Sequence, residues 1–382
     1  MERSIAHIDM DTFFVSCERL QDSRLNGKPI LVGGSSNRGV VAACSYEARK
    51  HGIHSAMPMK LARQLCPEAI VLRGDMSAYT KLSEIVTEIV KESVPIYEKT
   101  SIDEFYLDLT GTDHFFGSYK LVSELRERII KETGLPLSFG LSINKTVSKI
   151  ATGEAKPNNK IKIEQGREKD FLAPLSVKKI PMVGKKTYHT LCNLGVKQIK
   201  TLQEVPVEML EQVFGKSGRI MWNKANGIDN TPVIQYSERK SMSKERTFET
   251  DTIDVKYMKS IIGEMTESLL FQLRTKKKLT SCVTLKIRYS DFTTQTLQKR
   301  IPYSSLDHDI LPIAKSLFDK VYSKRLLVRL IGVKFSHLVE GGHQINIFED
   351  NAKMISLYQA LDKIKTKYGS KSVVRAFTNQ TK

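Results

Sequence analysis

Cysteine is scarce in this sequence, and it lacks the spacing of a disulfide framework. The 382 residues include five cysteines, at positions 17, 44, 66, 192 and 282, with no Cys-x-x-Cys pair among them. An odd number at wide spacings argues against a disulfide-stabilised secreted domain and against a zinc site. We therefore expect a protein of a reducing compartment.

Long apolar runs are also missing. No stretch of about 18 apolar residues occurs, so no transmembrane helix is predicted. The first residues, MERSIAHID, contain no apolar segment of signal-peptide length. Hydrophobic residues still make up 40% of the chain, which is enough for folded cores. We expect a cytoplasmic monomer of about two to four domains, without a membrane partner.

Positive charge is in excess, and it is unevenly spread. The chain has 60 Lys and Arg against 42 Asp and Glu, a net charge of +18. Residues 1–165 are nearly neutral at +1, whereas residues 166–232, 233–340 and 341–382 carry +5, +8 and +4. A basic downstream half indicates a polyanionic partner, most often nucleic acid. A lysine-rich solvated surface gives the same count, so charge alone leaves both interpretations open.

Periodicity over residues 1–165 follows the split βαβ order once the block at 19–75 is set aside. The strand-like SIAHID begins this order and LSFGLSI ends it, with amphipathic helices expected over 75–93 and 117–133. Between these helices, IYEKTSIDEFYLDLT is expected to form two strands around a tight bend. The order predicts a ferredoxin-like sheet with SIAHID at its centre.

Residues 240–336 repeat that order without evident sequence similarity. Strands are expected at 241–250, 281–289, 293–301 and 325–335, and helices at 254–274 and 307–323. Between the two blocks, residues 168–230 are predicted to be short helices, two of them joined by the small turn within IPMVGKKTYHTLCNLGV. The whole pattern is typical of a multidomain α+β protein.

Two stretches, HIDMD and SIDEFYLD, concentrate carboxylates in apolar strand contexts. A single Asp at a strand end commonly caps a helix, and Asp11 directly precedes a helix-like segment, so we interpret Asp11 as its N-cap. Neighbouring strands would bring Asp9, Asp103 and Glu104 together, and adjacent buried carboxylates need a cation. Hard oxygen ligands suit Mg²⁺ or Mn²⁺, which predicts a site for metal-assisted phosphoryl or nucleotidyl transfer.

A phosphate substrate also needs cations, which CSYEARKHG and GEAKPNN offer. Tyr46 and Arg49 stand three apart and so share a helix face, and Lys156 falls at a helix end. An isolated Tyr/Arg pair usually lies on the surface, and a lysine at a helix C-terminus commonly interacts with the helix dipole. These residues alone therefore leave both interpretations open.

Five motifs, in this order and spacing, resemble those of the Y-family translesion DNA polymerases, in particular the DNA polymerase IV branch. They are HIDMDTFFVSCE, CSYEARKHGIHSAMP, SIDEFYLDLT, LSFGLSINKTVSKIATGEAKPN and, more loosely, IGVKFSHL. The resemblance covers residues 1–340. It implies a palm at 1–18 and 75–165, fingers at 19–74, a helix-hairpin-helix thumb at 166–232, a linker at 233–241, a little finger at 242–340 and a tail at 341–382.

The resemblance also implies the catalytic centre of a DNA-directed DNA polymerase specialised for low-fidelity translesion synthesis in DNA damage tolerance. Asp9, Asp103, Glu104 and the main-chain carbonyl of Met10 match the ligands of two Mg²⁺ ions, for which Mn²⁺ is a possible substitute. The first ion would activate the primer 3′-OH, and the second would clamp the triphosphate and stabilise the leaving pyrophosphate.

Nucleotide contacts follow from the same resemblance. Phe14 matches the steric gate that excludes a ribonucleotide 2′-OH, and Phe13 is expected to help floor the nucleotide pocket. Tyr46, Arg49 and Lys156 match contacts to the triphosphate of the incoming dNTP, where they would neutralise developing charge.

With this resemblance in place, the basic downstream half is expected to bind primer-template DNA. In TSCVTLKIRYS, the alternating Thr284, Lys286 and Arg288 would lie along a phosphate backbone, while the intervening apolar residues pack on helices. An ordinary half-exposed strand has the same pattern. Our candidate DNA contacts are Lys185, Lys244, Arg246, Lys286, Arg288 and Arg329. In the thumb turn, Met182 stands where the family usually has Gly, so either the turn differs or its phosphate contact is weaker.

The tail contains QINIF, which resembles the peptide by which bacterial polymerases bind the sliding clamp. Its matching residues are Gln344, Ile347 and Phe348, although a short edge strand is the simpler alternative. Two other functions share parts of the whole pattern. A palm-fold nucleotide cyclase would require Gly-Gly where Thr100 and Ser101 stand, and a non-catalytic DNA-binding scaffold would not need three acids at the palm centre.

Overall fold

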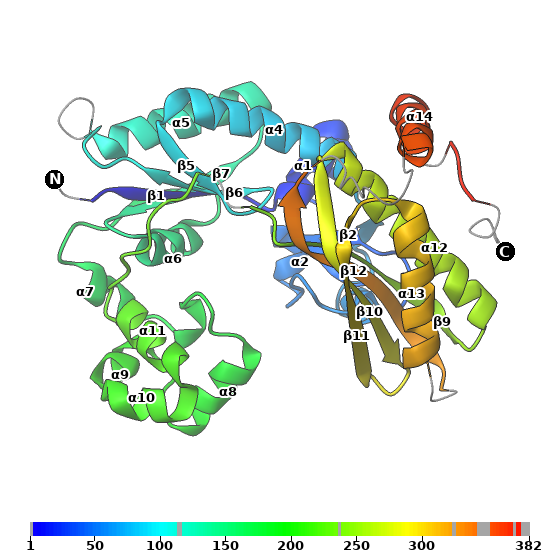
Figure 1. Ribbon diagram of the computed structural model, residues 1–382. Coiled ribbons are helices and arrows are strands. Elements are labelled where there is room, and N and C mark those ends of the chain that lie inside the picture. Colours follow the sequence, from blue (N-terminus) through cyan, green and yellow to red (C-terminus); the bar gives the residue numbers. More distant parts are fainter. Residues whose placement is uncertain are drawn as a thin grey trace. The chain divides into compact units, whose positions relative to one another are not determined.

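The computed structural model describes residues 3–112, 117–235, 238–322, 326–341, 352–369 and 372–375 (Figure 1). The chain divides into two compact units, Met1–Ser237 and Glu238–Lys382. The expected clamp-binding residues Gln344–Phe348 lie outside the described ranges. None of the described helices combines the length and the hydropathy that a bilayer span requires.

A five-stranded sheet forms the centre of the first unit, in the order β5-β6-β1-β7-β8. Its strands are β1 (Ile5–Met10), β5 (Ile96–Lys99), β6 (Glu104–Asp108), β7 (Leu137–Ser142) and β8 (Lys160–Lys162). As the sequence predicts, β1 occupies the middle and pairs antiparallel with both β6 and β7. The tight bend between β5 and β6 therefore lies beside the end of β1.

Helices cover both faces of this sheet (Figure 1). The helices α4 (Met76–Ser93) and α5 (Ser118–Thr133) lie on one face, and α6 (Lys145–Ala155) lies on the other. The core between the sheet, α1 (Phe13–Gln21), α4 and α5 buries apolar side chains from alternate strand positions, such as Ala6, Ile8, Phe105 and Leu107. The opposite positions of β1 and β6 consequently face α6.

The block at 19–74 forms a small three-stranded sheet in the order β3-β2-β4. It contains η1 (Ser23–Leu25), β2 (Ile30–Gly33), β3 (Val41–Cys44), α2 (Tyr46–Arg49), α3 (Met59–Leu65) and β4 (Ile70–Leu72). Its own apolar cluster includes Leu31, Val41, Cys44 and Met59. The Ser45 side chain caps α2 by accepting from the Ala48 main-chain N–H, which fixes where α2 begins.

Short helices follow, as the sequence predicts for residues 168–230. They are α7 (Glu168–Leu172), η3 (Val177–Lys179), α8 (Lys185–Asn193), α9 (Ile199–Glu204), α10 (Val207–Phe214) and α11 (Lys216–Ala225). The chain then returns along the first sheet. Asp229 accepts hydrogen bonds from the N–H and the hydroxyl of Thr146 at the start of α6, and the Ile234 N–H donates to Glu98 of β5. The start of the expected linker is thus bound to the first sheet.

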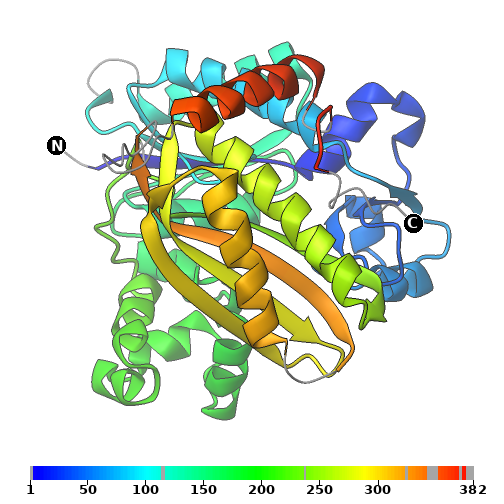
Figure 2. The ribbon, with the colours of Figure 1, turned by 45° about the vertical axis from the view of Figure 1, so that its right-hand side comes forward.

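The second unit repeats the strand-helix order that the sequence predicts. Its sheet has the order β11-β10-β12-β9, with β9 (Ser241–Thr252), β10 (Lys278–Tyr289), β11 (Thr294–Ser304) and β12 (Val328–Glu340). The helices α12 (Val255–Thr275) and α13 (Asp307–Val321) lie side by side on one face of this sheet (Figure 2). The predicted α+β class is confirmed, and the two sheet domains share the order of their strands and helices along the chain.

A last helix, α14 (Ala352–Tyr368), covers the amphipathic stretch MISLYQALDKIKTKY and packs on α12 and α13. Tyr358 is buried against His308, with the two rings stacked at 5.9 Å. Arg274, at the end of α12, forms 2.7 Å ion pairs with Asp362 of α14 and with Asp307 of α13. A buried guanidinium between two carboxylates therefore fastens α14 to the second unit.

Candidate active site and nucleic-acid interface

The side chains of β1 separate by face. Ala6, Ile8 and Met10 belong to the apolar core, whereas His7 and Asp9 face α6. His7 is buried and contacts the Thr152 hydroxyl at 3.0 Å. Burial, reinforced by nearby lysines, lowers the pKa of His7, so the imidazole is neutral at pH 7.

Asp9 is more buried than Glu104, a second expected metal ligand, whose side chain is 26% exposed. The Asp9 side chain is only 14% exposed, and its Oδ1 lies 2.5 Å from Lys156 Nζ. Burial raises the pKa of Asp9 to about 7, while Lys156 acts in the opposite direction. A carboxylate that is poorly solvated and held by one cation is suited to bind a further one.

The two other carboxylates come from the start of β6. Glu104 is the register partner of Asp9, and the Met10 N–H donates to the Asp103 carbonyl at 3.1 Å. Ser101 Oγ lies 2.6 Å from Asp103 Oδ1, and Lys149 Nζ lies 2.7 Å from Glu104 Oε2. The fold therefore brings the three residues to one end of the central strands, as the sequence predicts.

Their oxygen atoms do not converge on one point. Within the described ranges, the ligand atoms of Asp9, Asp103 and Glu104 do not all lie within 4.8 Å of one another. Two of these carboxylates pair with lysines, Asp9 with Lys156 and Glu104 with Lys149. The donor set still fits a hard divalent ion, since three carboxylates and the adjacent Met10 carbonyl offer only oxygen.

The lysines of α6 form a stripe that the sequence analysis did not identify. Lys145 and Lys149 stand four apart, so they share the face of α6 turned toward the sheet, and Lys156 extends the row as the C-cap residue of α6, where the backbone is extended. They pair with Glu98 at 2.7 Å, Glu104 at 2.7 Å and Asp9 at 2.5 Å. Only Lys156 was predicted to act at the site. The helical spacing of the other two was the signal that could have revealed them.

A glycine lets α6 approach the sheet this closely. A Cβ atom at Gly140 of β7 would lie 2.3 Å from the Ser148 carbonyl oxygen and 2.6 Å from the Thr152 nitrogen, both in α6. No side chain fits at that position without moving the helix. Gly140 thereby sets the distance between the lysine stripe and the acids of β1 and β6.

The interpretation of Asp11 as an N-cap is wrong. Thr12 separates it from α1 and has a left-handed φ of 43°, and no described side chain caps this helix. The buried Asp11 carboxylate instead accepts from Ser138 Oγ at 2.9 Å, the Asn158 N–H at 2.6 Å and the Tyr46 hydroxyl at 3.3 Å. Asp11 therefore joins β7, the turn after α6 and α2.

The two phenylalanines differ in exposure. Phe13 is 3% exposed and belongs to the apolar core, so its expected part in the floor of the nucleotide pocket stays a prediction. Phe14 is partly exposed and stacks on Tyr79 of α4, with ring centroids 4.6 Å apart and planes 15° apart. The ring centroids of Phe13 and Phe14 lie 5.7 Å apart, and this contact helps to hold the Phe14 ring in place.

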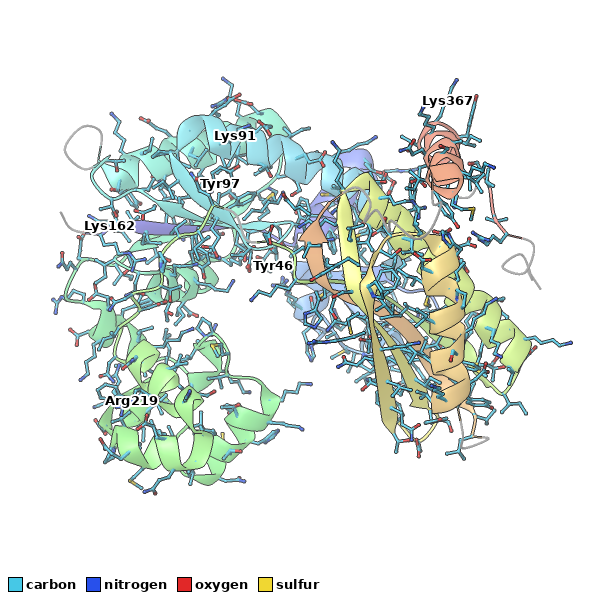
Figure 3. All side chains as sticks on the ribbon, in the orientation of Figure 1. Tyr46, Lys91, Tyr97, Lys162, Arg219 and Lys367 are labelled. Atoms are coloured by element: carbon cyan, nitrogen blue, oxygen red, sulfur yellow. The ribbon has the colours of Figure 1, made fainter. Side chains whose placement is uncertain are left out.

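Tyr46 begins α2 (Figure 3), and Arg49 lies on the same face of this helix, as their spacing predicts. The Arg49 guanidinium lies over the Tyr46 ring, 4.9 Å from its centroid. Burial, with Asp11 nearby, raises the pKa of Tyr46, so its hydroxyl remains a neutral donor. The hydrogen bond to Asp11 places this pair beside the end of β1.

In the second unit, strand parity separates the expected DNA contacts into two groups. Val283, Leu285 and Ile287 of β10 are buried toward the helices, so Lys286 and Arg288 point to the opposite face. No described helix of this unit covers that face (Figure 2). Lys286 forms a 2.9 Å ion pair there with Glu245 of β9.

Lys244 and Arg246 lie on the other face. They alternate with Glu245 and share the parity of Met242 and Phe248, which are buried against α12. Lys244 binds Ser268, and Arg246 pairs with Glu264 at 3.1 Å, both partners being in α12. Lys244 and Arg246 thus lie on the opposite face from Lys286 and Arg288, so the structure does not favour them as DNA contacts.

The open face holds two cations that the sequence analysis missed. Register pairs Lys334 of β12 with Thr284, and Arg300 of β11 with Cys282, so both belong to the parity of Lys286. Both side chains are exposed. Arg329, one of the predicted contacts, lies over the Phe292 ring in the turn between β10 and β11, 4.7 Å from its centroid.

The thumb turn keeps a left-handed residue without glycine. Met182 has φ 84° and is 70% exposed, and Lys185 begins α8 two residues after Val183. The turn therefore adopts the conformation that glycine favours, at a cost that L residues ordinarily avoid. The main-chain N–H groups at the start of α8 receive no side-chain cap from the described residues.

Family models match most of the chain. A model described as the impB/mucB/samB family matches residues 8–153, and one described as its C-terminal domain matches residues 239–347. A third, described as the DNA polymerase-iota thumb domain, matches residues 178–229.

Curated relatives and solved structures agree with these matches. A Dehalococcoides mccartyi protein named DNA polymerase IV is 40% identical, over 100% of this chain and 98% of its own length. A Clostridium perfringens protein of the same name is 38% identical over 93% of this chain and 98% of its own. A Y-family polymerase chimera of Dbh and Dpo4 has a TM-score of 0.80 at 26% identity, and an insertion ternary complex of Dbh DNA polymerase has 0.63 at 25%. Each structure covers 88% of this chain and is itself covered completely.

Proposed function

Because the chain belongs to the Y family of DNA polymerases, the impB/mucB/samB family, we propose that its nucleotidyl transfer takes place at Asp9, Asp103 and Glu104. The chain is a DNA-directed translesion DNA polymerase of the DNA polymerase IV type. This family membership supports neither a nucleotide cyclase nor a non-catalytic scaffold. The observation that carries the proposal is the meeting of a buried acid from β1 with two acids from the adjoining bend.

Divalent metal ions are required by this family, and we propose Mg²⁺ here, with Mn²⁺ as a substitute. Asp9, Asp103, Glu104 and the Met10 carbonyl would hold two ions. When bound, such ions lower the pKa of the primer 3′-OH and stabilise charge on the triphosphate and the leaving pyrophosphate. Lys149 would release or reorient Glu104 for this purpose, since the two now pair at 2.7 Å.

The triphosphate of the dNTP would bind the cations around Asp9. Lys156 is partly exposed beside Asp9, and Arg49 is held over the Tyr46 ring. These groups would neutralise the β- and γ-phosphates and orient the α-phosphate toward the primer. Asp11 acts as a positioning residue, because its carboxylate holds the Tyr46 hydroxyl and the turn that follows Lys156.

Phe14 would select the sugar. Its ring is fixed between Phe13 and Tyr79, so it cannot easily move aside for an additional hydroxyl. A rigid ring at the 2′ position of the incoming nucleotide rejects ribonucleotides by steric exclusion.

Primer-template DNA would lie along the open face of the second sheet and at the thumb turn. Lys286, Arg288, Lys334 and Arg300 present cations on one face, which suits sequence-independent phosphate contacts. Lys185 and Arg329 remain candidate contacts.

We also propose that Gln344, Ile347 and Phe348 bind a bacterial sliding clamp, that the enzyme acts as a monomer and that it works in the cytoplasm.

Primer extension by the purified chain, with Mg²⁺ and all four dNTPs, tests the proposed site. We expect the wild type to extend a primed template and Asp103→Ala to be inactive while it still binds DNA. Equal extension by both proteins would contradict the assignment of the site.

Deleting Gln344–Phe348 should remove stimulation by the clamp and spare basal extension, and surviving stimulation would contradict the clamp assignment.

A further inference from the structure

Three potential metal ligands meet in the small sheet region, away from the three acids of β1 and β6. They are His51 after α2, and Cys66 and Glu68 between α3 and β4. One ligand atom from each lies within 4.8 Å of the other two, and this is the one such group of three within the described ranges. The sequence alone does not reveal it, since His51 and Cys66 are separated by 15 positions and no Cys-x-x-Cys occurs.

Local structure fixes two of these residues in place. Cys66 ends α3 and is fully buried, and its carbonyl accepts from the Ala69 N–H in a turn that has Pro67 at its second position. That turn returns Glu68 toward Cys66, so that a carboxylate oxygen lies within 4.8 Å of the Cys66 sulfur. His51 follows Lys50, the C-cap residue of α2, and its N–H donates to the Ala48 carbonyl at 3.1 Å.

The distances are close to those of a metal site. His51 Nε2 and Glu68 Oε1 are 3.7 Å apart, and a tetrahedral ion with bonds of about 2.1 Å separates such ligands by about 3.4 Å. The side chains of His51 and Glu68 are 43% and 60% exposed, so both can adjust while buried Cys66 stays fixed. Solvent can occupy a fourth position.

The ligand chemistry selects the ion. Thiolate, imidazole and carboxylate together suit Zn²⁺, whereas Mg²⁺ prefers oxygen ligands alone. We propose that His51, Cys66 and Glu68 bind one Zn²⁺ ion and so fasten the end of α2 to the end of α3. Arg49 stands two residues before His51, so the ion would steady the turn that follows Arg49. This inference does not depend on the proposed polymerase site.

Cobalt binding tests the site on the full-length chain. The metal-free protein, kept reduced with a phosphine, is titrated with Co²⁺ and then with Zn²⁺ while the absorption spectrum is recorded. We expect one thiolate-to-cobalt charge-transfer band per chain, which Zn²⁺ abolishes by displacement. Only a sulfur ligand produces this band, so carboxylates at Asp9 or Asp103 cannot mimic it. The band is therefore expected in Asp103→Ala as well, whether or not that variant extends primers.

Exposed variants keep the test independent of folding. His51→Gln and Glu68→Gln should each weaken Zn²⁺ affinity by about 10-fold or more, because even outer-shell changes cost about that much. His54→Gln, also exposed, and Cys192→Ser serve as matched controls and should bind as the wild type does. Zn²⁺ should raise the thermal midpoint of the wild type but not of His51→Gln. No charge-transfer band in the wild type, or a band that His51→Gln and Glu68→Gln leave intact, would overturn the proposal.

Discussion

The two large sheets of this protein share an order of elements but differ in what faces their polar side. Each has two helices on its apolar face, α4 and α5 in the first unit and α12 and α13 in the second. In the first unit, α6 covers the other face, and the lysines of α6 and its C-cap pair with the acids of β1, β5 and β6. In the second, the corresponding face of the described sheet carries cations and no helix.

The difference indicates a division of labour. Covering a face lowers its dielectric environment and shifts pKa values, as burial does for Asp9. Chemistry requires such a site, because charge stabilisation is strongest where water is excluded. An open cationic face instead suits a long, mobile polyanion, whose contacts need not be exact in position.

The largest expected effect comes from replacing Asp9, the acid of the central strand, which should abolish nucleotidyl transfer. Asp9→Asn should lower the single-turnover extension rate by about 10³-fold or more, because metal-assisted charge stabilisation contributes several kcal/mol. Rapid-quench extension measures this rate. Asp108→Asn, at the far end of β6, is the matched control and should stay close to wild type. An Asp9→Asn variant that still extends primers would contradict the assignment of nucleotidyl transfer to the first sheet.

Loss of the buried arginine should damage the second unit alone. Arg274→Ala leaves buried Asp307 with only the more distant Arg375, 3.6 Å away, and breaking such a buried pair costs up to about 3–5 kcal/mol in the free energy of unfolding. Denaturant unfolding followed by circular dichroism measures it. Arg246→Ala breaks an exposed pair with Glu264 and should cost at most about 1 kcal/mol. Equal losses would show that the ion pairs to α14 contribute little.

Sugar selection should depend on the Phe14 ring. Phe14→Ala should raise ribonucleotide incorporation relative to deoxynucleotide incorporation by about 10²-fold, since a pocket discriminates a single hydroxyl by that order. Competing single-nucleotide insertions measure the ratio. Phe14→Tyr retains the ring and should retain discrimination. An unchanged ratio in Phe14→Ala would refute the gate.

The smallest expected effect is the difference in DNA binding between variants on the two faces of the second sheet. Lys286→Ala with Arg288→Ala should weaken DNA binding and reduce the slope of log K against log salt by about 2, because each neutralised phosphate contributes roughly 0.9 to that slope. Lys244→Ala with Arg246→Ala removes the same charge from the covered face and should leave the slope close to wild type. Equal slopes for the two pairs would contradict the assignment of the faces.

Much of the fold was predictable, because periodicity and strand-end acids are local features. The split βαβ order and the meeting of Asp9 with Glu104 follow from alternation and topology. Lys244 shares its parity with the apolar Met242 and Phe248, so alternation already indicated the face that a helix covers. Asp11 has the sequence context of a cap, yet the left-handed Thr12 turns its side chain toward Ser138.

Interactions between distant segments explain the remaining errors. The partners of Lys145 and Lys149 lie on other strands, so their helical spacing had meaning only once α6 was placed on the sheet. Phe13 and Phe14 are adjacent in sequence, and only packing against Tyr79 shows which ring is exposed. Met182 shows the opposite case, in which a residue that disfavours the left-handed conformation adopts it.

The central claim is that the first sheet performs the chemistry and the second binds DNA. Measuring both the extension rate at saturating DNA and the DNA dissociation constant, for Asp103→Ala and for Lys286→Ala with Arg288→Ala, tests it most directly. We expect Asp103→Ala to lose the rate and keep the dissociation constant. The lysine-arginine pair should weaken binding in a salt-dependent way and keep the rate. Variants that each change both quantities would contradict the division between the two sheets.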